Sequence, residues 1–440
     1  MKSDILEVIC IMDNEVKKIP CKNECCNRLI LEVTAKKTGG YCYPCYNYIE
    51  GKKREEYIRK NKRTVNLYEG IHDPVEMIKI MGIRREYNPL IEYVKCPKTK
   101  EELYSILTKD HMKRLKEIAM ESYKSGTDQW EDILLNLVCF NNADINGFLK
   151  ILINDGKVYE SSLFKNASDE IADMLIDKLE CNDESISLNH ILLCLAMIGN
   201  ERVVELFNKW KKDTPEFAEK LYVKPHEYSY EGGWKLDENG NRKDLYYHES
   251  YGVKEGVPPK NASVKFYETN EDKCKWCGRY LDSLFTIDLK NKHMEFLGVE
   301  GDRLNISTCS NCTCYGYIYT DIDTCGHAHW SSYNSKPNYL DTNEYEELDE
   351  IDVKKQVYVD NNVKSENYGA NQFLDMKFTK IGGMPTWIQD AEYPKCPKCG
   401  EEMMFVGQLS NEDFEEYAEG IYYGFVCKEC MIAATTYQQT

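Results

Sequence analysis

Two stretches of the chain repeat a cysteine pattern that could hold a metal ion. The first stretch carries Cys274, Cys277, Cys309 and Cys312, and the second carries Cys396, Cys399, Cys427 and Cys430. Two residues between paired cysteines let the chain turn so that both sulfurs face one point. Four thiolates then form a closed tetrahedral zinc site with no position left for a substrate. The spacing therefore predicts two structural Zn²⁺ sites.

The same glycine follows the leading pair in both stretches. Gly278 comes directly after Cys277, and Gly400 comes directly after Cys399. A glycine here permits the positive φ that completes the turn, whose backbone amides can then donate hydrogen bonds to the thiolates. Each stretch resembles one zinc ribbon with sequential pairing. A cross-braced order, in which Cys274/Cys277 joins Cys396/Cys399, stays open but does not explain the repeat.

A third cysteine group stands near the N-terminus. Its members are Cys21, Cys42 and Cys45, with either Cys25 or Cys26 as the fourth. The run Thr38-Gly39-Gly40 predicts a turn before Cys42, and the residues after it predict a helix that begins at the metal. This order of turn, cysteines and helix resembles a small treble-clef finger and predicts a third structural Zn²⁺.

The predicted helix continues into the basic run GKKREEYIRKNKR, residues 51–63. Clustered Lys and Arg can contact the phosphates of a nucleic acid. Aromatic residues that would stack on bases are not clearly interleaved with these cations. A solvated connecting helix is therefore favoured over a nucleic-acid site.

One further cluster has residue types suited to catalysis. Cys325, His327 and His329 lie close together, and the two histidines would share one face of a strand. They could bind a fourth metal in an enzyme, but their order matches no common zinc motif. Two exposed imidazoles at a strand end are the favoured interpretation. Phosphate-binding loops, nucleophile elbows and zinc-protease helices are not found in the sequence, so we expect no enzymatic activity.

Composition and charge indicate the cellular compartment and the class of partner. The chain has 440 residues, 20 cysteines and a formal net charge of −18. Asp4 and Glu7 interrupt the apolar N-terminal stretch, which argues against a secretory signal and predicts the reducing cytoplasm. The negative charge disfavours nucleic acid and suits a basic protein partner. Apolar runs are too short to cross a membrane, and the oligomeric state is not predicted.

Three zones of different composition must position these sites. Residues 1–63 form the cysteine-rich finger, residues 64–222 are rich in Leu and Ile, and residues 223–440 are rich in Tyr, Gly and cysteine pairs. The middle zone predicts amphipathic helices. Asp128 with Glu131 predicts a capping box, and Gly199-Asn200 predicts a turn between two helices. The two helices joined at Gly199-Asn200 resemble a HEAT repeat.

The third zone predicts strands, because apolar and aromatic residues alternate in it, as in YGYIYTDID. An acidic stretch, residues 341–352, predicts a solvated loop or helix. The expected fold class is multidomain α+β, with an N-terminal finger, a helical HEAT-like domain and a β-rich domain that carries two zinc ribbons.

One long motif in the third zone carries a family resemblance. The stretch IGGMPTWIQDAEYPKCPKCG, with Gly382, Gly383, Pro385, Trp387 and Gln389 ahead of its cysteine pair, resembles the bacterial YwqG-like family, a domain of unknown function. The resemblance covers residues 260–440. The N-terminal TGGYCYPC is similar to a cysteine module of proteins from bacterial toxin–immunity neighbourhoods. Together these resemblances imply an immunity protein that neutralises a toxin. With the acidic charge and the closed metal sites, they lead us to expect a non-enzymatic protein whose partner is a basic toxin domain.

Overall fold

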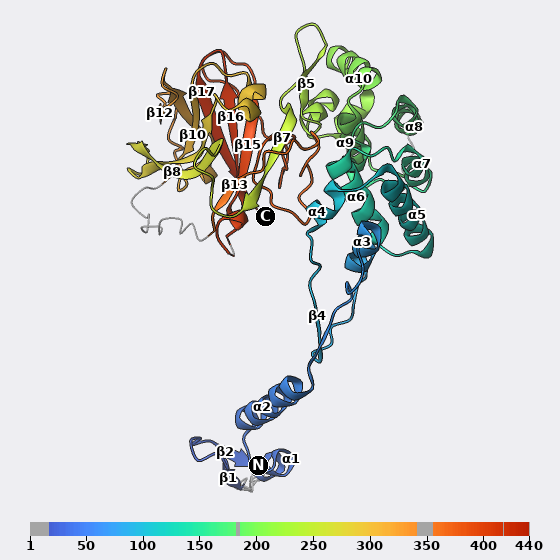
Figure 1. Ribbon diagram of the computed structural model, residues 1–440, viewed down its shortest axis with the longest axis vertical. Helices are drawn as coiled ribbons and strands as arrows, with labels where there is room; N and C mark the ends of the chain where they lie inside the picture. Colours follow the sequence, from blue (N-terminus) through green and yellow to red (C-terminus); the bar gives the residue numbers. More distant parts are fainter. Residues whose placement is uncertain (1–16, 182–184, 341–354, 417, 440) are drawn as a thin grey trace, which may run out of the picture. The chain divides into compact units, whose positions relative to one another are not determined.

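The computed structural model describes residues 17–181, 185–340, 355–416 and 418–439, and the acidic stretch 341–352 lies outside them. The chain folds into two compact units (Figure 1). The first comprises Met1–Ile71 with Ile83–Pro97, and the second comprises His72–Gly82 with Lys98–Thr440. The finer division into zones 1–63, 64–222 and 223–440 stays a prediction.

The first unit is small and has few buried apolar residues. Its elements are β1 (Lys18–Pro20), β2 (Leu29–Leu31), α1 (Glu32–Thr38), α2 (Tyr43–Asn61), β3 (Arg63–Val65) and β4 (Ile91–Tyr93). β1 and β2 form an antiparallel hairpin, whereas β3 and β4 pair in parallel. Cys21, Ile30 and Cys42 form its buried cluster. The cysteines are therefore a large part of the core that this unit has.

The second unit begins with an array of helices. They are α3 (Pro74–Gly82), α4 (Lys100–Ser105), α5 (Lys109–Ser125), α6 (Gln129–Asn141), α7 (Asn146–Asn154), α8 (Asp169–Glu180), α9 (Leu188–Ile198) and α10 (Glu201–Lys212). A short 3-10 turn, η1 (Ser161–Phe164), lies between α7 and α8, and two more follow α10: η2 (Glu216–Lys220) and η3 (Pro225–Tyr230). In Figure 1, α6 and α9 lie toward the β-sheet, and α5, α7 and α8 lie on the far side. The predicted helices of this region are confirmed, while the HEAT resemblance stays a prediction.

The predicted turn at Gly199-Asn200 is confirmed. Gly199 ends α9 in the left-handed conformation with φ +51°, and Asn200 caps α10 by accepting a hydrogen bond of 3.0 Å from the Val203 N–H. The glycine supplies a backbone angle that other residues adopt at a cost, and the Asn oxygen satisfies an N–H that the first turn leaves without a partner.

The capping box predicted at Asp128 and Glu131 is wrong. Asp128 has helical backbone angles, and its side chain makes no cap hydrogen bond. The hydroxyl of Ser122, at the end of α5, instead accepts from the Trp130 N–H at 3.1 Å. Since Ser122 of the neighbouring helix already accepts from the Trp130 N–H, a cap hydrogen bond from Asp128 to this N–H would add little.

The rest of the second unit is mainly strand. An eight-stranded antiparallel sheet has the order β12-β11-β17-β16-β15-β14-β7-β13. Its strands are β7 (Tyr247–Glu255), β11 (Ile318–Ile322), β12 (Ala328–Trp330), β13 (Val357–Val359), β14 (Lys380–Gly383), β15 (Met404–Ser410), β16 (Ile421–Cys427) and β17 (Ile432–Gln438). A three-stranded sheet contains β8 (Val264–Lys273), β9 (Tyr280–Asp288) and β10 (Arg303–Thr308). The alternation seen in the sequence thus becomes strand, as predicted.

Smaller elements complete this part of the chain. β5 (Trp234–Leu236) and β6 (Arg242–Asp244) form a hairpin, and 3-10 turns occur at η4 (Lys292–Leu297), η5 (Thr313–Tyr315) and η6 (Asn411–Asp413). The Trp234 indole N–H donates to the carbonyl of Ala196 at 2.8 Å. This buried bond ties the hairpin to the end of α9.

The two sheets pack face to face on one apolar core. Phe285 and Ile306 from the small sheet join Val406 and Val426 from the large sheet, and all four are fully buried. Gly424 of β16 lies at a close approach of the two sheets, because a Cβ atom there would stand 2.9 Å from Ile306 Cγ2 and 3.0 Å from Phe285. The close approach requires a residue without a side chain at this position.

Membrane-spanning helices are not among the described elements: within the described ranges, every helix is too short or too polar to cross a bilayer.

Candidate metal centres

The structure brings the twelve predicted cysteines together in three groups of four. Within each group all four sulfur atoms lie within 4.8 Å of one another. The groups are site 1 (Cys21, Cys26, Cys42, Cys45), site 2 (Cys274, Cys277, Cys309, Cys312) and site 3 (Cys396, Cys399, Cys427, Cys430). Pairing is therefore sequential, and the cross-braced order is not formed. Cys26 belongs to site 1, whereas Cys25 is exposed outside it.

The sulfur–sulfur distances fit a tetrahedral metal better than a disulfide. A metal bound to four sulfurs at about 2.3 Å places neighbouring sulfurs about 3.8 Å apart by simple geometry. The Sγ atoms of Cys26 and Cys42 are 3.7 Å apart, those of Cys274 and Cys312 3.8 Å, and those of Cys399 and Cys427 3.7 Å. A disulfide bond would require about 2.05 Å. The described cysteines are thus free thiols, and the twelve grouped ones have a spacing that suits a tetrahedral metal.

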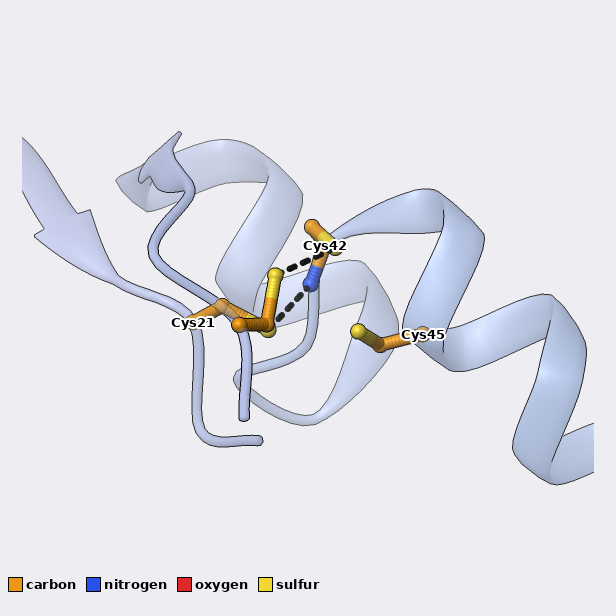
Figure 2. Close-up of side chains that lie close together, drawn as sticks. Cys21, Cys42 and Cys45 are labelled. Atoms are coloured by element: carbon orange, nitrogen blue, oxygen red, sulfur yellow. Dashed lines mark hydrogen bonds between the residues drawn. The ribbon is translucent and has the colours of Figure 1, made fainter. Parts of the chain in front are cut away.

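Site 1 joins the β1–β2 hairpin to the start of α2. Cys21 follows β1, Cys42 is the N-cap of α2, and Cys45 lies in the first turn of that helix. Figure 2 shows the side chains of Cys42 and Cys45 on the helix start, opposite that of Cys21. Gly39 and Gly40 precede this helix with φ of +67° and +96°, so they form the turn that the sequence predicted. The helix that begins at the cysteines is confirmed.

Hydrogen bonds support the thiolates of site 1. The Cys42 N–H donates to Cys21 Sγ at 3.2 Å, and Asn23 Nδ2 donates to Cys45 Sγ at 3.2 Å. A backbone N–H at Cys45 is the largest of the effects that lower the pKa of Cys42, which is brought to about 7. Donors of this kind favour the thiolate, the form that binds a metal. At Cys45 the Asn23 hydrogen bond lowers the pKa, but the neighbouring Cys42 thiol and burial raise it to about 12. Asn23 is a supporting residue that the cysteine spacing alone did not reveal.

Site 2 lies at the ends of the small sheet. Cys274 directly follows β8 and Cys309 directly follows β10. Cys274, Cys309 and Cys312 are at most 1% exposed. Trp276, inside the first pair, packs edge to face on Trp330 of β12 with ring centroids 5.4 Å apart. The cysteines share one buried cluster with these rings and Leu281, so a metal here would join the ends of β8 and β10 beside β12 of the large sheet.

Site 3 lies within the large sheet itself. Cys427 is the last residue of β16, Cys430 precedes β17, and the Cys396/Cys399 pair leads into β15. Cys396 is 1% exposed and Cys427 8%, whereas Cys399 is exposed. The Glu401 N–H is the largest effect that lowers the pKa of Cys399. The strands around this site are held by the core between the sheets as well as by the cysteines.

The leading turns of sites 2 and 3 repeat each other in their hydrogen bonds. Gly278 donates to the Cys274 carbonyl at 2.8 Å, and Gly400 donates to the Cys396 carbonyl at 2.8 Å. The two glycines have φ of +82° and +80°, with open space where a Cβ atom would stand. Glycine is therefore favoured at both positions by the backbone angle and not by crowding. The repeated sequence pattern corresponds to repeated local geometry.

The Cys325/His327/His329 cluster does not form a fourth group. Both imidazoles are about half exposed, and His329 Nε2 lies 3.2 Å from Asp323 Oδ2. Arg303 approaches His327 at 3.3 Å, which places a cation where a metal would need a ligand. Across the described residues, only the three cysteine groups bring enough ligand atoms together for a metal.

The large sheet also contains a buried lysine that no sequence motif indicates. Lys380 on β14 is fully buried, and its Nζ donates to the Tyr368 and Gly369 carbonyls at 2.8 and 3.2 Å and to Thr386 Oγ1 at 3.1 Å. It also donates to the Met384 carbonyl. These four oxygen partners tie the Tyr368–Gly369 segment to Met384 and Thr386. In the sequence, Lys380 stands between Thr379 and Ile381 in a strand-like run, which gives no signal that its ammonium group is buried.

Comparison with known proteins gives one full-length relative. The chain is 37% identical over 429 residues to the uncharacterized protein YpfL of Salmonella typhimurium, covering 96% of this chain and all of that protein. A search of family models found no match. A search of solved structures found none either.

Proposed function

This chain belongs to the same family as Salmonella YpfL, and we propose that it is a zinc protein whose metal ions are structural. Its three cysteine groups support this proposal. The observation that carries the proposal is the tetrahedral spacing of four sulfurs in each group. Zinc is the metal that thiolate sets of this kind most often hold. A four-thiolate shell is closed, so the ion would supply a crosslink and no reactive position.

The small cores support a structural role for the metal. In the first unit, Ile30 is accompanied in the buried cluster by two cysteines of site 1. In site 2, all four cysteines belong to a cluster with two tryptophans. A core of this size stabilises a fold only weakly without a crosslink. Zinc binding, which releases on the order of 10–16 kcal/mol in small zinc peptides, would supply the stabilisation that these small cores lack.

We propose further that sites 2 and 3 are zinc ribbons of a YwqG-like domain, and that site 1 is a treble-clef finger. Both ribbon sites place a Cys-x-x-Cys-Gly turn at one strand connection and a second cysteine pair at another. In site 3 the strands continue as part of the eight-stranded sheet. The second ribbon would therefore be an extension of the larger domain.

The biological role that we propose is non-catalytic binding of another protein, with a basic bacterial toxin as the partner and the cytoplasm as the location. The resemblance of residues 260–440 to the YwqG-like family supports the immunity role. The formal charge of −18 supports a cationic partner, since an acidic surface attracts one over a distance. Reduced thiols remain available as ligands in the cytoplasm.

Metal analysis tests the structural proposal. We expect purified protein to contain three zinc ions per chain, and the same three after His327→Ala combined with His329→Ala. A fourth, exchangeable ion that the double substitution removes would favour a metal-dependent enzyme. Protein that contains no zinc when it is purified from zinc-supplied cells would contradict the proposal.

The binding role needs a separate experiment. Affinity purification from the native host at low salt should recover a basic protein, which high salt should release. That protein should arrest growth when expressed alone, and co-expression of this chain should restore growth. Recovery of no basic partner, or a partner that is harmless by itself, would count against the immunity role and leave the metal proposal intact.

A further inference from the structure

The charge of this protein is divided unevenly between its parts. Residues 17–63, which we call the basic finger, hold site 1 and contain thirteen Lys and Arg against five Asp and Glu. The whole chain nevertheless has a formal charge of −18. The total therefore conceals a strongly cationic segment. We propose that the basic finger binds nucleic acid through its phosphates, a role beyond the protein binding proposed above.

Most cations of the basic finger are exposed and make no ion pair with a described residue. Lys52, Lys53 and Lys60 pair with glutamates of α2, and Lys62 pairs with Glu92. The other nine are exposed and form no ion pair with a described residue: Lys17, Lys18, Lys22, Arg28, Lys36, Lys37, Arg54, Arg59 and Arg63. Phosphate binding gains from such cations because each one that meets a phosphate releases condensed counterions from the nucleic acid.

Helix α2 covers no core beyond its first turn at site 1. None of its residues is buried, and its apolar side chains do not gather on one face. A helix that covers a core would have a buried stripe, and one that lies on a membrane would have an apolar face. Its 19 residues extend over about 28 Å. α2 therefore presents charge along a length that can follow a nucleic-acid backbone.

Aromatic rings accompany the cations. Tyr43, Tyr48 and Tyr57 of α2 are 52%, 66% and 59% exposed. Lys52 Nζ lies 5.8 Å from the centre of the Tyr48 ring. Exposed rings beside cations can stack on unpaired bases. The sequence shows these tyrosines only as part of a helical run, whereas the structure places them exposed beside the cations, where stacking on bases is possible.

Binding is tested with the full zinc-loaded chain and short fluorescent oligonucleotides, single-stranded and duplex, by anisotropy. We expect affinity to fall steeply between about 50 and 200 mM salt, with a log–log slope that reflects how many phosphates the protein neutralises. Substitution of Arg54→Gln, Arg59→Gln, Lys36→Gln and Lys37→Gln together should reduce that slope on duplex by up to about 0.9 for each phosphate that is no longer neutralised. Tyr48→Ala should weaken single-strand binding about fivefold or more.

The matched control is Lys113→Gln with Lys124→Gln on α5, two exposed lysines of the other unit without an ion pair to a described residue. It should leave the slope unchanged, and zinc content and circular dichroism should be the same in all variants. The proposal is overturned by no binding at the lowest salt, or by equal reductions of affinity in the control and finger variants. Binding to vesicles of anionic lipid without binding to either oligonucleotide also overturns it.

Discussion

Cys25 and Cys26 are neighbours in the chain, yet only one of them can serve site 1. The Cys26 sulfur lies 3.7 Å from that of Cys42, whereas Cys25 is exposed and uses its backbone N–H to bond Asn23 Oδ1 at 3.1 Å. Asn23 in turn donates from its amide group to Cys45 Sγ. One asparagine thus supports the turn and a thiolate, and the turn determines which of two adjacent sulfurs faces inward.

A pair of serine substitutions tests this assignment. Cys26→Ser should lower the zinc content by one ion per chain and destabilise the first unit, because a weak ligand replaces a thiolate. Cys25→Ser should leave the zinc content unchanged. Metal analysis with protease sensitivity of α2 reports both effects. The reverse result, with Cys25 required and Cys26 dispensable, would contradict the described geometry.

At the scale of elements, helix ends in the array are satisfied in different ways. Asn200 caps α10 with its own side chain, and Thr99 and Glu102 form a capping box at α4. At α6 the cap comes from Ser122 of the preceding helix. A sequence motif at a helix start therefore indicates a cap correctly only where no other element reaches the same N–H.

Two alanine substitutions separate these cases. Asn200→Ala should lower the free energy of unfolding by about 1 kcal/mol, since the Val203 N–H loses its partner. Asp128→Ala should change it by less than about 0.5 kcal/mol, since the Asp128 side chain makes no cap bond. Urea denaturation of both variants measures the difference. Equal destabilisation by the two substitutions would show that Asp128 acts as a cap in solution.

At the scale of the whole molecule, the three sites are embedded in very different amounts of core. Site 1 accounts for most of the buried cluster of its unit. Site 3 lies in an eight-stranded sheet that also packs on the extensive core between the two sheets. Metal binding contributes to folding wherever a pre-formed site is lost on unfolding, and it contributes most where little else holds the chain.

Removal of metal should therefore unfold the protein in stages. A strong zinc chelator should make α2 sensitive to trypsin, which cleaves at its many Lys and Arg residues, before the strands of the large sheet become accessible. Mass spectrometry of the fragments over time would establish the order, and added zinc should restore protection. Simultaneous loss of protection in all regions would mean that the units unfold as one.

The sequence by itself determined the candidate ligands and most of the elements. Cysteine spacing specified eleven of the twelve grouped cysteines and left only Cys25 or Cys26 open, because a Cys-x-x-Cys turn is a local feature. The helices and strands followed from short-range periodicity for the same reason. Tertiary structure decided what depends on distant residues: which cysteine pairs meet, which amide Ser122 satisfies, how Lys380 is buried, and where the second cysteine repeat joins the large sheet. Those outcomes depend on packing between segments far apart in the chain, which local spacing does not specify.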